Sequence, residues 1–318
     1  MPFPSRALIA AAALAAAGAA QAATAVDLGI ASQFSAITFG DFTGYGGDTG
    51  SLLGVGGNAT LTNWTVNAYN VAGYNGYSFV VGGDLTATNG RINGTAGVGG
   101  TATATNFNNP SISSTSSVLN FAQLQSQLTS TSTSTAAVAS TGTVSYNANN
   151  STFLTGTGSD VEVFSIDGSK FTAGGTYLEG LTDIKSNATV ILNVSGKNIS
   201  MGSFGFDLPD DGKNLNLLVN FYEATTLSFS NIAIEGAVLA PFAAVTGTSG
   251  HIGGTFIAQS FNSTGVGDFE FHDINFNPVV IPSPVPEPAE WALFGAGLLV
   301  APMVLRRQRR RDVAAAAQ

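Results

Sequence analysis

A nine-residue pattern that begins Val-Gly-Gly occurs three times in the first third of the chain, at residues 55–63, 81–89 and 98–106. In each copy the glycine pair precedes threonines that alternate with other residues, mainly alanine and leucine. Glycine pairs favour tight turns, and alternation favours a strand with one buried face. The copies start 26 and then 17 residues apart (81 − 55 and 98 − 81). Repeats of about twenty residues are typical of solenoids, so the pattern predicts stacked coils.

The alternation also predicts which side chains these coils bury. The apolar positions of the three copies are expected to point inward: Ala59, Leu61, Leu85, Ala87, Ala102 and Ala104. The threonines then form an exposed polar ladder on the opposite side of the strands. One coil cannot bury its own apolar face, so the fold requires the coils to stack on one another.

Strand-like runs continue downstream and are punctuated by Asn and Gly. They cover residues 189–194, 215–222, 226–234, 237–239, 255–258 and 269–271. Two glycine-led segments, 236–241 and 253–258, repeat at a spacing similar to that of the early copies. We interpret them as later coils of the same solenoid.

One segment departs from the strand pattern. Apolar residues recur there at helical spacing, at positions 118, 121, 124 and 128. Ser117 is a suitable N-cap, so we expect one helix over residues 118–130 along a flank of the core. The Ser/Thr run 129–135 either extends this helix or frays. The predicted fold is all-β: a right-handed parallel β-helix with one flanking α-helix.

Composition agrees with a packed domain. Of 318 residues, 44% are hydrophobic and 10% charged, and the mean hydropathy is +0.24. Such a chain can bury a large core and is not expected to be disordered. There is no cysteine, which excludes disulfides, thiolate metal sites and a cysteine nucleophile.

The N-terminus has the features of a signal peptide. Arg6 precedes an apolar Ala/Leu run over residues 7–20, and Ala20-Gln21-Ala22 has the small-x-small pattern of a cleavage site. We expect cleavage by signal peptidase after Ala22, with an Ala-rich helix of the folded domain as the alternative.

The C-terminus carries a second apolar segment. Trp291 to Leu305 is uncharged. An arginine cluster follows at once: Arg306, Arg307, Arg309, Arg310 and Arg311. Those arginines stay cytoplasmic by the positive-inside rule. At about 1.5 Å per residue the segment is short for a ~30 Å hydrocarbon core, so it predicts a C-terminal transmembrane helix that serves as a temporary anchor.

A proline-containing motif precedes that helix: Val285, Pro286, Glu287 and Pro288. The order of motif, apolar helix and arginine cluster resembles the C-terminal signal of PEP-CTERM proteins, which Gram-negative bacteria export. The resemblance covers about the last thirty residues. It implies recognition and cleavage by the membrane protease exosortase, commonly in bacteria that produce exopolysaccharide. A plain membrane anchor without processing is the alternative.

These features divide the chain into five parts. We expect a signal peptide (1–22), a β-helix domain (23–278), a linker with the motif (279–288), a sorting helix with the arginine cluster (289–311) and a tail (312–318). The ends contribute six of the eleven basic residues and three of the twenty acidic ones. The mature domain then has 17 acids and 5 bases, a net charge near −12. This excludes a nucleic-acid-binding surface, which needs basic residues.

The middle of the chain also resembles a known family. Its landmarks are residues 28–36, the Val-Gly-Gly coils, the helix, and the closing segments 236–241 and 253–258. Together they are similar to the choice-of-anchor A domain of bacterial surface proteins, and the similarity covers nearly the whole mature chain. The resemblance implies an adhesive role and supplies no catalytic residues.

Few residues are candidates for chemistry. His251 and His272 lie 21 residues apart and can stack on adjacent coils, near Asp268, Glu270 and Asp273. Metal binding needs converging ligands, so surface histidines without a metal are the preferred interpretation. We expect no cofactor.

Two other groups of residues are candidates for a binding or catalytic role. Asp207, Asp210 and Asp211 suit either paired-carboxylate or calcium chemistry, but Pro209 and Gly212 make a plain turn the preferred interpretation. Four aromatic residues can stack on sugars or pack in turns and core: Trp64, Tyr69, Tyr74 and Tyr77. Core or turn packing is preferred for them.

We therefore predict a non-catalytic surface or matrix adhesin, exported through the inner membrane of a Gram-negative bacterium. Its expected partners are signal peptidase, exosortase and exopolysaccharide or cell-surface glycans, with no nucleic acid. A polysaccharide-active β-helix enzyme and an ice-binding β-helix remain alternatives, the latter because ordered threonine ladders can contact ice.

Overall fold

A computed structural model describes residues 23–108, 111–115, 118–173, 178–203, 205, 215–263, 265 and 267–282. One folded unit spans Thr24–Ile281. It closes with β24 (Val279–Ile281), which pairs antiparallel with β1 (Thr24–Val26), so it includes three residues predicted to be linker. The predicted signal peptide, sorting motif and C-terminal helix lie outside the described residues. Among the described helices, none is long and apolar enough to cross a membrane.

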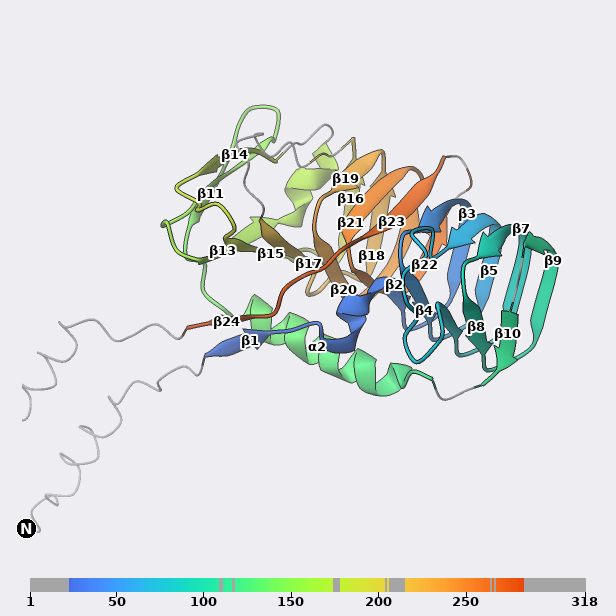
Figure 1. Ribbon diagram of the computed structural model, residues 1–318. Helices are drawn as coiled ribbons and strands as arrows, with labels where there is room; N and C mark the ends of the chain where they lie inside the picture. The colour runs from blue at the N-terminus through green and yellow to red at the C-terminus, as the bar shows by residue number, and fades with distance from the viewer. Residues whose placement is uncertain are drawn as a thin grey trace, which may run out of the picture. The chain divides into compact units, whose positions relative to one another are not determined.

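The unit is a parallel β-helix with three faces, seen side-on in Figure 1. The first, here called the helix face, is a continuous parallel ladder. In spatial order its strands are β13 (Val161–Asp167), β15 (Thr189–Ser195), β17 (Asn216–Asn220), β20 (Ala237–Gly247), β22 (Phe256–Ser263), β2 (Phe34–Thr38), β4 (Leu52–Val55), β6 (Phe79–Val81), β8 (Thr95–Val98) and β10 (Ser111–Ser114).

The other two faces are here called the hydroxyl face and the ring face. The hydroxyl face consists of β16 (Asn198–Gly202), β18 (Thr226–Ser230), the second halves of β20 and β22, then β3 (Phe42–Thr49), β5 (Ala59–Val66), β7 (Leu85–Ile92) and β9 (Ala102–Asn108). The ring face consists of β19 (Ile232–Ile234), β21 (Gly250–Gly254) and β23 (Phe269–Ile274), continued by the last residues of β3, β5 and β7.

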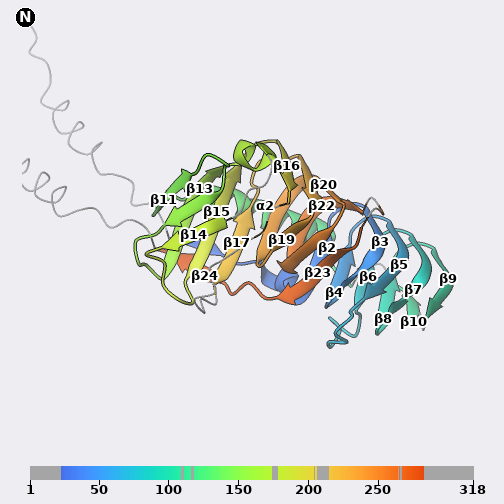
Figure 2. The same ribbon diagram turned by 90° about the horizontal axis from the view of Figure 1, so that it is seen from above.

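The order of coils in space differs from their order in sequence. Strand β2, in the first coil, pairs with β4 on one side and with β22, in a late coil, on the other. The chain therefore starts in the middle of the solenoid and builds outward to β10. It then returns along the flank and builds inward from β13 until the late coils dock on the first one, as Figure 2 shows.

The flanking helix α2 (Phe121–Ala136) carries the chain back across the helix face. It begins three residues later than predicted, with Asn120 as its N-cap, and it ends six residues later. The Asn120 side chain accepts a hydrogen bond from the Gln123 amide at 3.0 Å. The predicted cap, Ser117, lies outside the described residues. Leu124 and Leu128 of α2 are buried against the helix face, as the helical spacing predicted.

The Ser/Thr run 129–135 stays helical because side chains of the solenoid form hydrogen bonds with it. Ser132 donates to the Asn220 carboxamide oxygen at 2.6 Å, and Asn220 donates back to the Ser132 carbonyl at 2.9 Å. Asn193 donates to the Thr135 carbonyl at 3.0 Å. Ser132 and Thr135 are both buried, so tertiary contacts outweigh the weak helix propensity of this run.

Stacked glycines form the corner between the helix face and the hydroxyl face. The second residue of each Val-Gly-Gly motif lies directly on the backbone of the coil before it. A Cβ atom on Gly82 would lie 2.3 Å from the Gly56 carbonyl oxygen, and one on Gly99 would lie 2.3 Å from that of Gly82. These turns require glycine because no side-chain atom fits between the coils.

An adjoining ladder of side chains fixes the same corner. The Asp41 carboxylate accepts from the Asn58 amide at 2.7 Å, and the Asn58 side chain accepts from the Asp84 amide at 2.8 Å. Asp84 continues the ladder to the Thr101 amide at 2.7 Å. The side chains of Asp41, Asn58 and Asp84 thus each link one coil to the next.

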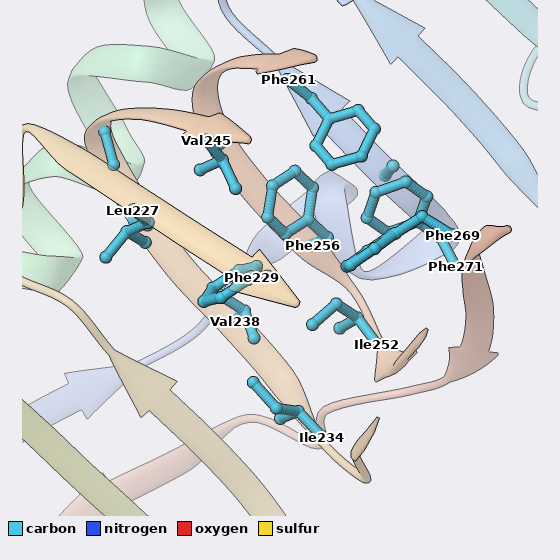
Figure 3. Packing of buried hydrophobic residues seen from close by; sticks show 14 of the residues in the cluster. Leu227, Phe229, Ile234, Val238, Val245, Ile252, Phe256, Phe261, Phe269 and Phe271 are labelled. Atoms are coloured by element: carbon cyan, nitrogen blue, oxygen red, sulfur yellow. The ribbon is translucent and has the colours of Figure 1, made fainter. Parts of the chain in front are cut away.

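The interior is filled by inward-pointing side chains from all three faces. Ala59, Leu61, Leu85 and Ala87 are buried as predicted. Ala102 and Ala104 are exposed, because their strand β9 belongs to the last coil at one end. In the late coils, phenylalanines dominate: Phe256, Phe261, Phe269 and Phe271 gather in one cluster (Figure 3). Their ring centroids lie 4.9–5.8 Å apart.

Candidate binding surfaces

The hydroxyl face presents one column of small polar side chains along eight neighbouring strands. In register, it reads Ser200, Ser228, Thr246, Asn262, Thr43, Thr60, Thr86 and Thr103. A second threonine column is present only on β5, β7 and β9, where Thr62, Thr88 and Thr105 lie side by side. On β3 the same position is Tyr45, with 43% of its surface exposed.

The ring face carries a row of three flat side chains on three coils, which we call the ring row: Tyr69, His272 and His251. The two imidazoles are stacked, with centroids 4.9 Å apart and planes inclined by 18°. The Tyr69 ring lies 6.5 Å from that of His272. Tyr69 is 53% exposed. The two histidines stack on adjacent coils, as their spacing of 21 residues allowed.

Carboxylates flank the ring row. Glu235 lies 2.6 Å from Nε2 of His251, and Glu270 lies 3.4 Å from Nε2 of His272. Asp48 is the register partner of Glu270 across the β3–β23 ladder. The face therefore offers several acceptor oxygens beside its rings.

Two groups on the ring face, Asp48 and Tyr69, have raised pKa values. Burial raises the pKa of the Asp48 carboxyl above its usual value, and the charge of Glu270 raises it further, against an opposing effect of His272. Burial also raises the pKa of the Tyr69 hydroxyl, assisted by Asp273, Asp48 and Glu270. Tyr69 therefore keeps its proton and remains a hydrogen-bond donor at neutral pH.

The ring row and the carboxylates beside it come together because of the order in which the coils stack. His251 and His272 come from the last coils, Asp48 from the first and Tyr69 from the loop after β5. Docking of β23 on β3 brings Glu270 and Asp48 together although 222 residues separate them (270 − 48). The sequence singled out the histidines, Glu270, Asp273 and Tyr69 but missed Asp48 and Glu235. No local pattern indicates that these two belong to the same surface.

The other sequence candidates are placed elsewhere or are not described. Trp64 is fully buried, and Tyr74 packs on Phe34 with ring centroids 6.0 Å apart, which confirms the packing interpretation for both. Tyr77 is partly buried and forms an isolated bridge with Tyr74. Asp207, Asp210 and Asp211 lie outside the described residues. Within the described part of the chain, no cluster of three or more His, Asp or Glu is arranged to hold a metal ion.

Comparison with known proteins then places the chain in a family. The family model described as "Putative Ice-binding-like adhesive domain" matches residues 27–272. The chain belongs to this family. The matched residues of the adhesive domain include the hydroxyl face and all three members of the ring row.

Among solved structures, the adhesive domain is similar to an ice-binding protein from an Antarctic ascomycete, Antarctomyces psychrotrophicus. The two share 14% identity with a TM-score of 0.36, and the match covers 80% of this chain and 99% of that one. No curated protein matches the chain.

Proposed function

We propose that this protein is a non-catalytic adhesive domain that binds polysaccharide through the ring row. The observation that carries the proposal is the row itself: two stacked imidazoles on adjacent coils, and the Tyr69 ring that approaches them across the coil of β3, beside carboxylates. Membership in an adhesive-domain family supports it.

The chemistry of the row suits sugar rings. An exposed tyrosine offers a flat apolar surface and a polar tip, and such surfaces contribute about 0.5–1.5 kcal/mol beyond area burial when they stack. Carboxylate oxygens accept hydrogen bonds from sugar hydroxyls. Because Asp48, Glu235 and Glu270 surround the rings, the site disfavours polyuronates, whose own carboxylates it repels. Neutral or amino-sugar polymers are the proposed ligands.

The proposal is tested by affinity electrophoresis of the chain through gels that contain a neutral glucan, a polyglucosamine or a polyuronate. Tyr69→Ala and His272→Ala are expected to weaken retardation by the glucan or the polyglucosamine about tenfold each, the effect of losing about 1.4 kcal/mol. Tyr45→Ala is the matched control, because Tyr45 is similarly exposed but lies on the hydroxyl face. Equal loss in all three variants, or retardation by the polyuronate alone, would count against the proposal.

Ice is a second candidate ligand, favoured by the paired threonine columns on β5, β7 and β9. This alternative demands that the purified protein shape growing ice crystals and that Thr86→Lys abolish the shaping. Round crystals in the presence of the wild-type chain would eliminate it.

We further propose that the chain is exported and sorted as a PEP-CTERM protein with a domain of choice-of-anchor A type. The supporting features are the small-x-small site at Ala22 and the ordered motif, apolar segment and arginine cluster at the other end. The mass of the chain recovered from the cell surface tests this. We expect the mass of a fragment that begins after Ala22 and ends near Pro288. A fragment with an intact C-terminus would instead support a membrane anchor without processing.

A further inference from the structure

One end of the β-helix has unpaired strand edges. Within the described residues, β9 pairs only with β7, and β10 pairs only with β8. Each of these end strands therefore presents a free row of backbone N–H and C=O groups. Such edges are templates for pairing with another chain unless they are blocked.

The same end leaves the hydrophobic interior uncovered. Ala102 and Ala104 are in register with Leu85 and Ala87, which are each only 1% exposed, yet both β9 alanines are exposed. Ile112 of β10 is in register with fully buried Ala96 and is itself 36% exposed. These inward-pointing side chains lack a next coil to cover them.

No charge protects this end. The chain has no Asp, Glu, Lys, Arg or His between Arg91 and Asp160, a run that contains all of β8, β9 and β10. Edge strands are commonly blocked by charged side chains or proline, and inward-pointing charges discourage edge pairing. The end coil carries no charged residue, and its one proline, Pro110, lies in sequence between β9 and β10 and not within either edge strand.

The opposite end of the β-helix is closed. A small sheet of β11 (Thr143–Tyr146), β12 (Thr152–Thr155) and β14 (Leu178–Thr182) lies there, as Figures 1 and 2 show. Leu154 and Leu178 of this sheet are buried in the common core. The two ends are therefore not equivalent, and among the described residues only the β9–β10 end offers uncovered core residues and free edges together.

We propose that the β9–β10 end docks on the same end of a second copy of this chain. A two-fold axis there would place β9 against its counterpart in antiparallel pairing and cover Ala102, Ala104 and Ile112 in both copies. The β9–β10 end carries no charge, so it does not attract a charged partner. The whole chain has a net charge of −9, but two uncharged ends can approach each other without local repulsion. Because a two-fold contact uses the β9–β10 end of both copies, association stops at a dimer and does not propagate into fibres.

Sedimentation velocity of the purified full chain in a mild non-ionic detergent tests the dimer over a concentration series. The wild-type chain is expected to dimerise with a Kd of about 10 μM or below. Ala104→Asp should raise that Kd at least about tenfold, because a buried unpaired carboxylate is costly. Thr60→Asp, on an exposed mid-solenoid position, is the matched control and should leave the Kd unchanged. Ala104 is exposed in the single copy, so neither substitution should prevent folding.

A second readout uses the absence of cysteine. Ala104→Cys provides the only thiol in the chain and should form an intermolecular disulfide under mild oxidation, whereas Thr60→Cys should not. A monomer at all concentrations, or a dimer that survives Ala104→Asp and fails to cross-link through Ala104→Cys, would overturn the proposal. The latter result would indicate association through another part of the chain.

Discussion

Glu162 shows how a single buried charge is accommodated in this domain. Its carboxylate is fully buried and accepts from the Thr141 hydroxyl at 2.6 Å, the Thr157 amide at 2.7 Å and the Ser159 amide at 2.9 Å. Burial alone would raise the pKa of Glu162, but the hydrogen bonds from Thr141, Thr157 and Ser159 outweigh it and hold the pKa below its usual value. The ionised carboxylate thus ties the turn at residues 157–159 to the solenoid.

The lowered pKa of Glu162 fixes the sign of a pH effect. A carboxyl group whose pKa is depressed by folding stabilises the fold above its unfolded value, about 4.3, and this contribution is lost as pH falls through the folded value. Glu162→Gln is expected to lower the free energy of unfolding at pH 7 by about 1–3 kcal/mol. The deficit relative to wild type should shrink below about pH 4. Urea unfolding of Glu162→Gln and of the wild type, at pH 7 and below about pH 4, measures this difference in the free energy of unfolding. An equal difference at the two pH values would contradict a stabilising role for the ionised Glu162.

At the scale of elements, α2 is fixed to the helix face by polar contacts as well as by leucines. Asn220→Ala removes the bonds to Ser132 and Asn193 and leaves buried groups unpaired. We expect it to lower the free energy of unfolding by about 2–3 kcal/mol, measured in urea. Thr133→Ala is the control, because Thr133 is an exposed residue of α2 that bonds only to its own helix. A similar loss of unfolding free energy in both variants would show that the contacts of Asn220 with α2 do not stabilise the fold.

The glycine turns make a second prediction about elements. Gly82→Ala forces a Cβ against the Gly56 carbonyl and should lower the free energy of unfolding by about 2–4 kcal/mol. Gly202→Ala, where a Cβ meets no atom within 4 Å, should change it by less than about 1 kcal/mol. Thermal unfolding of the two variants checks the contrast. Tolerance of alanine at Gly82 would mean that the coils are less tightly stacked than described.

At the scale of the whole molecule, the sequence predicts the coil but not the order of coils. Alternation and Val-Gly-Gly turns depend on neighbours within one coil, so they can be recognised locally. The docking of β22 on β2 cannot be recognised from a local pattern, because every parallel coil offers similar strand edges on both sides. The sequence left open whether the Ser/Thr run extends the helix, because Asn193 and Asn220, which hold the run in helical form, lie far along the chain.

The candidate site was predictable in part for the same reason. A coil of about twenty residues allowed His251 and His272 to stack, and they do, whereas Asp48 joins them only through the long-range β3–β23 ladder. The exposure of Tyr69 likewise depends on a loop whose path the sequence does not specify. The proposed binding through the ring row therefore depends on the assembled solenoid and not on a local motif.

Hydroxyl-radical footprinting of the full chain, with and without the polysaccharide that retards it, tests this central claim directly. It reports solvent access to individual side chains, and the rings of tyrosine and histidine are all oxidised by the radical. We predict that bound polysaccharide slows oxidation of Tyr69, His272 and His251 together and leaves the exposed Tyr45 unchanged. Slower oxidation of Tyr45 with no change in the ring row would contradict the claim and would indicate that the polysaccharide binds to the hydroxyl face.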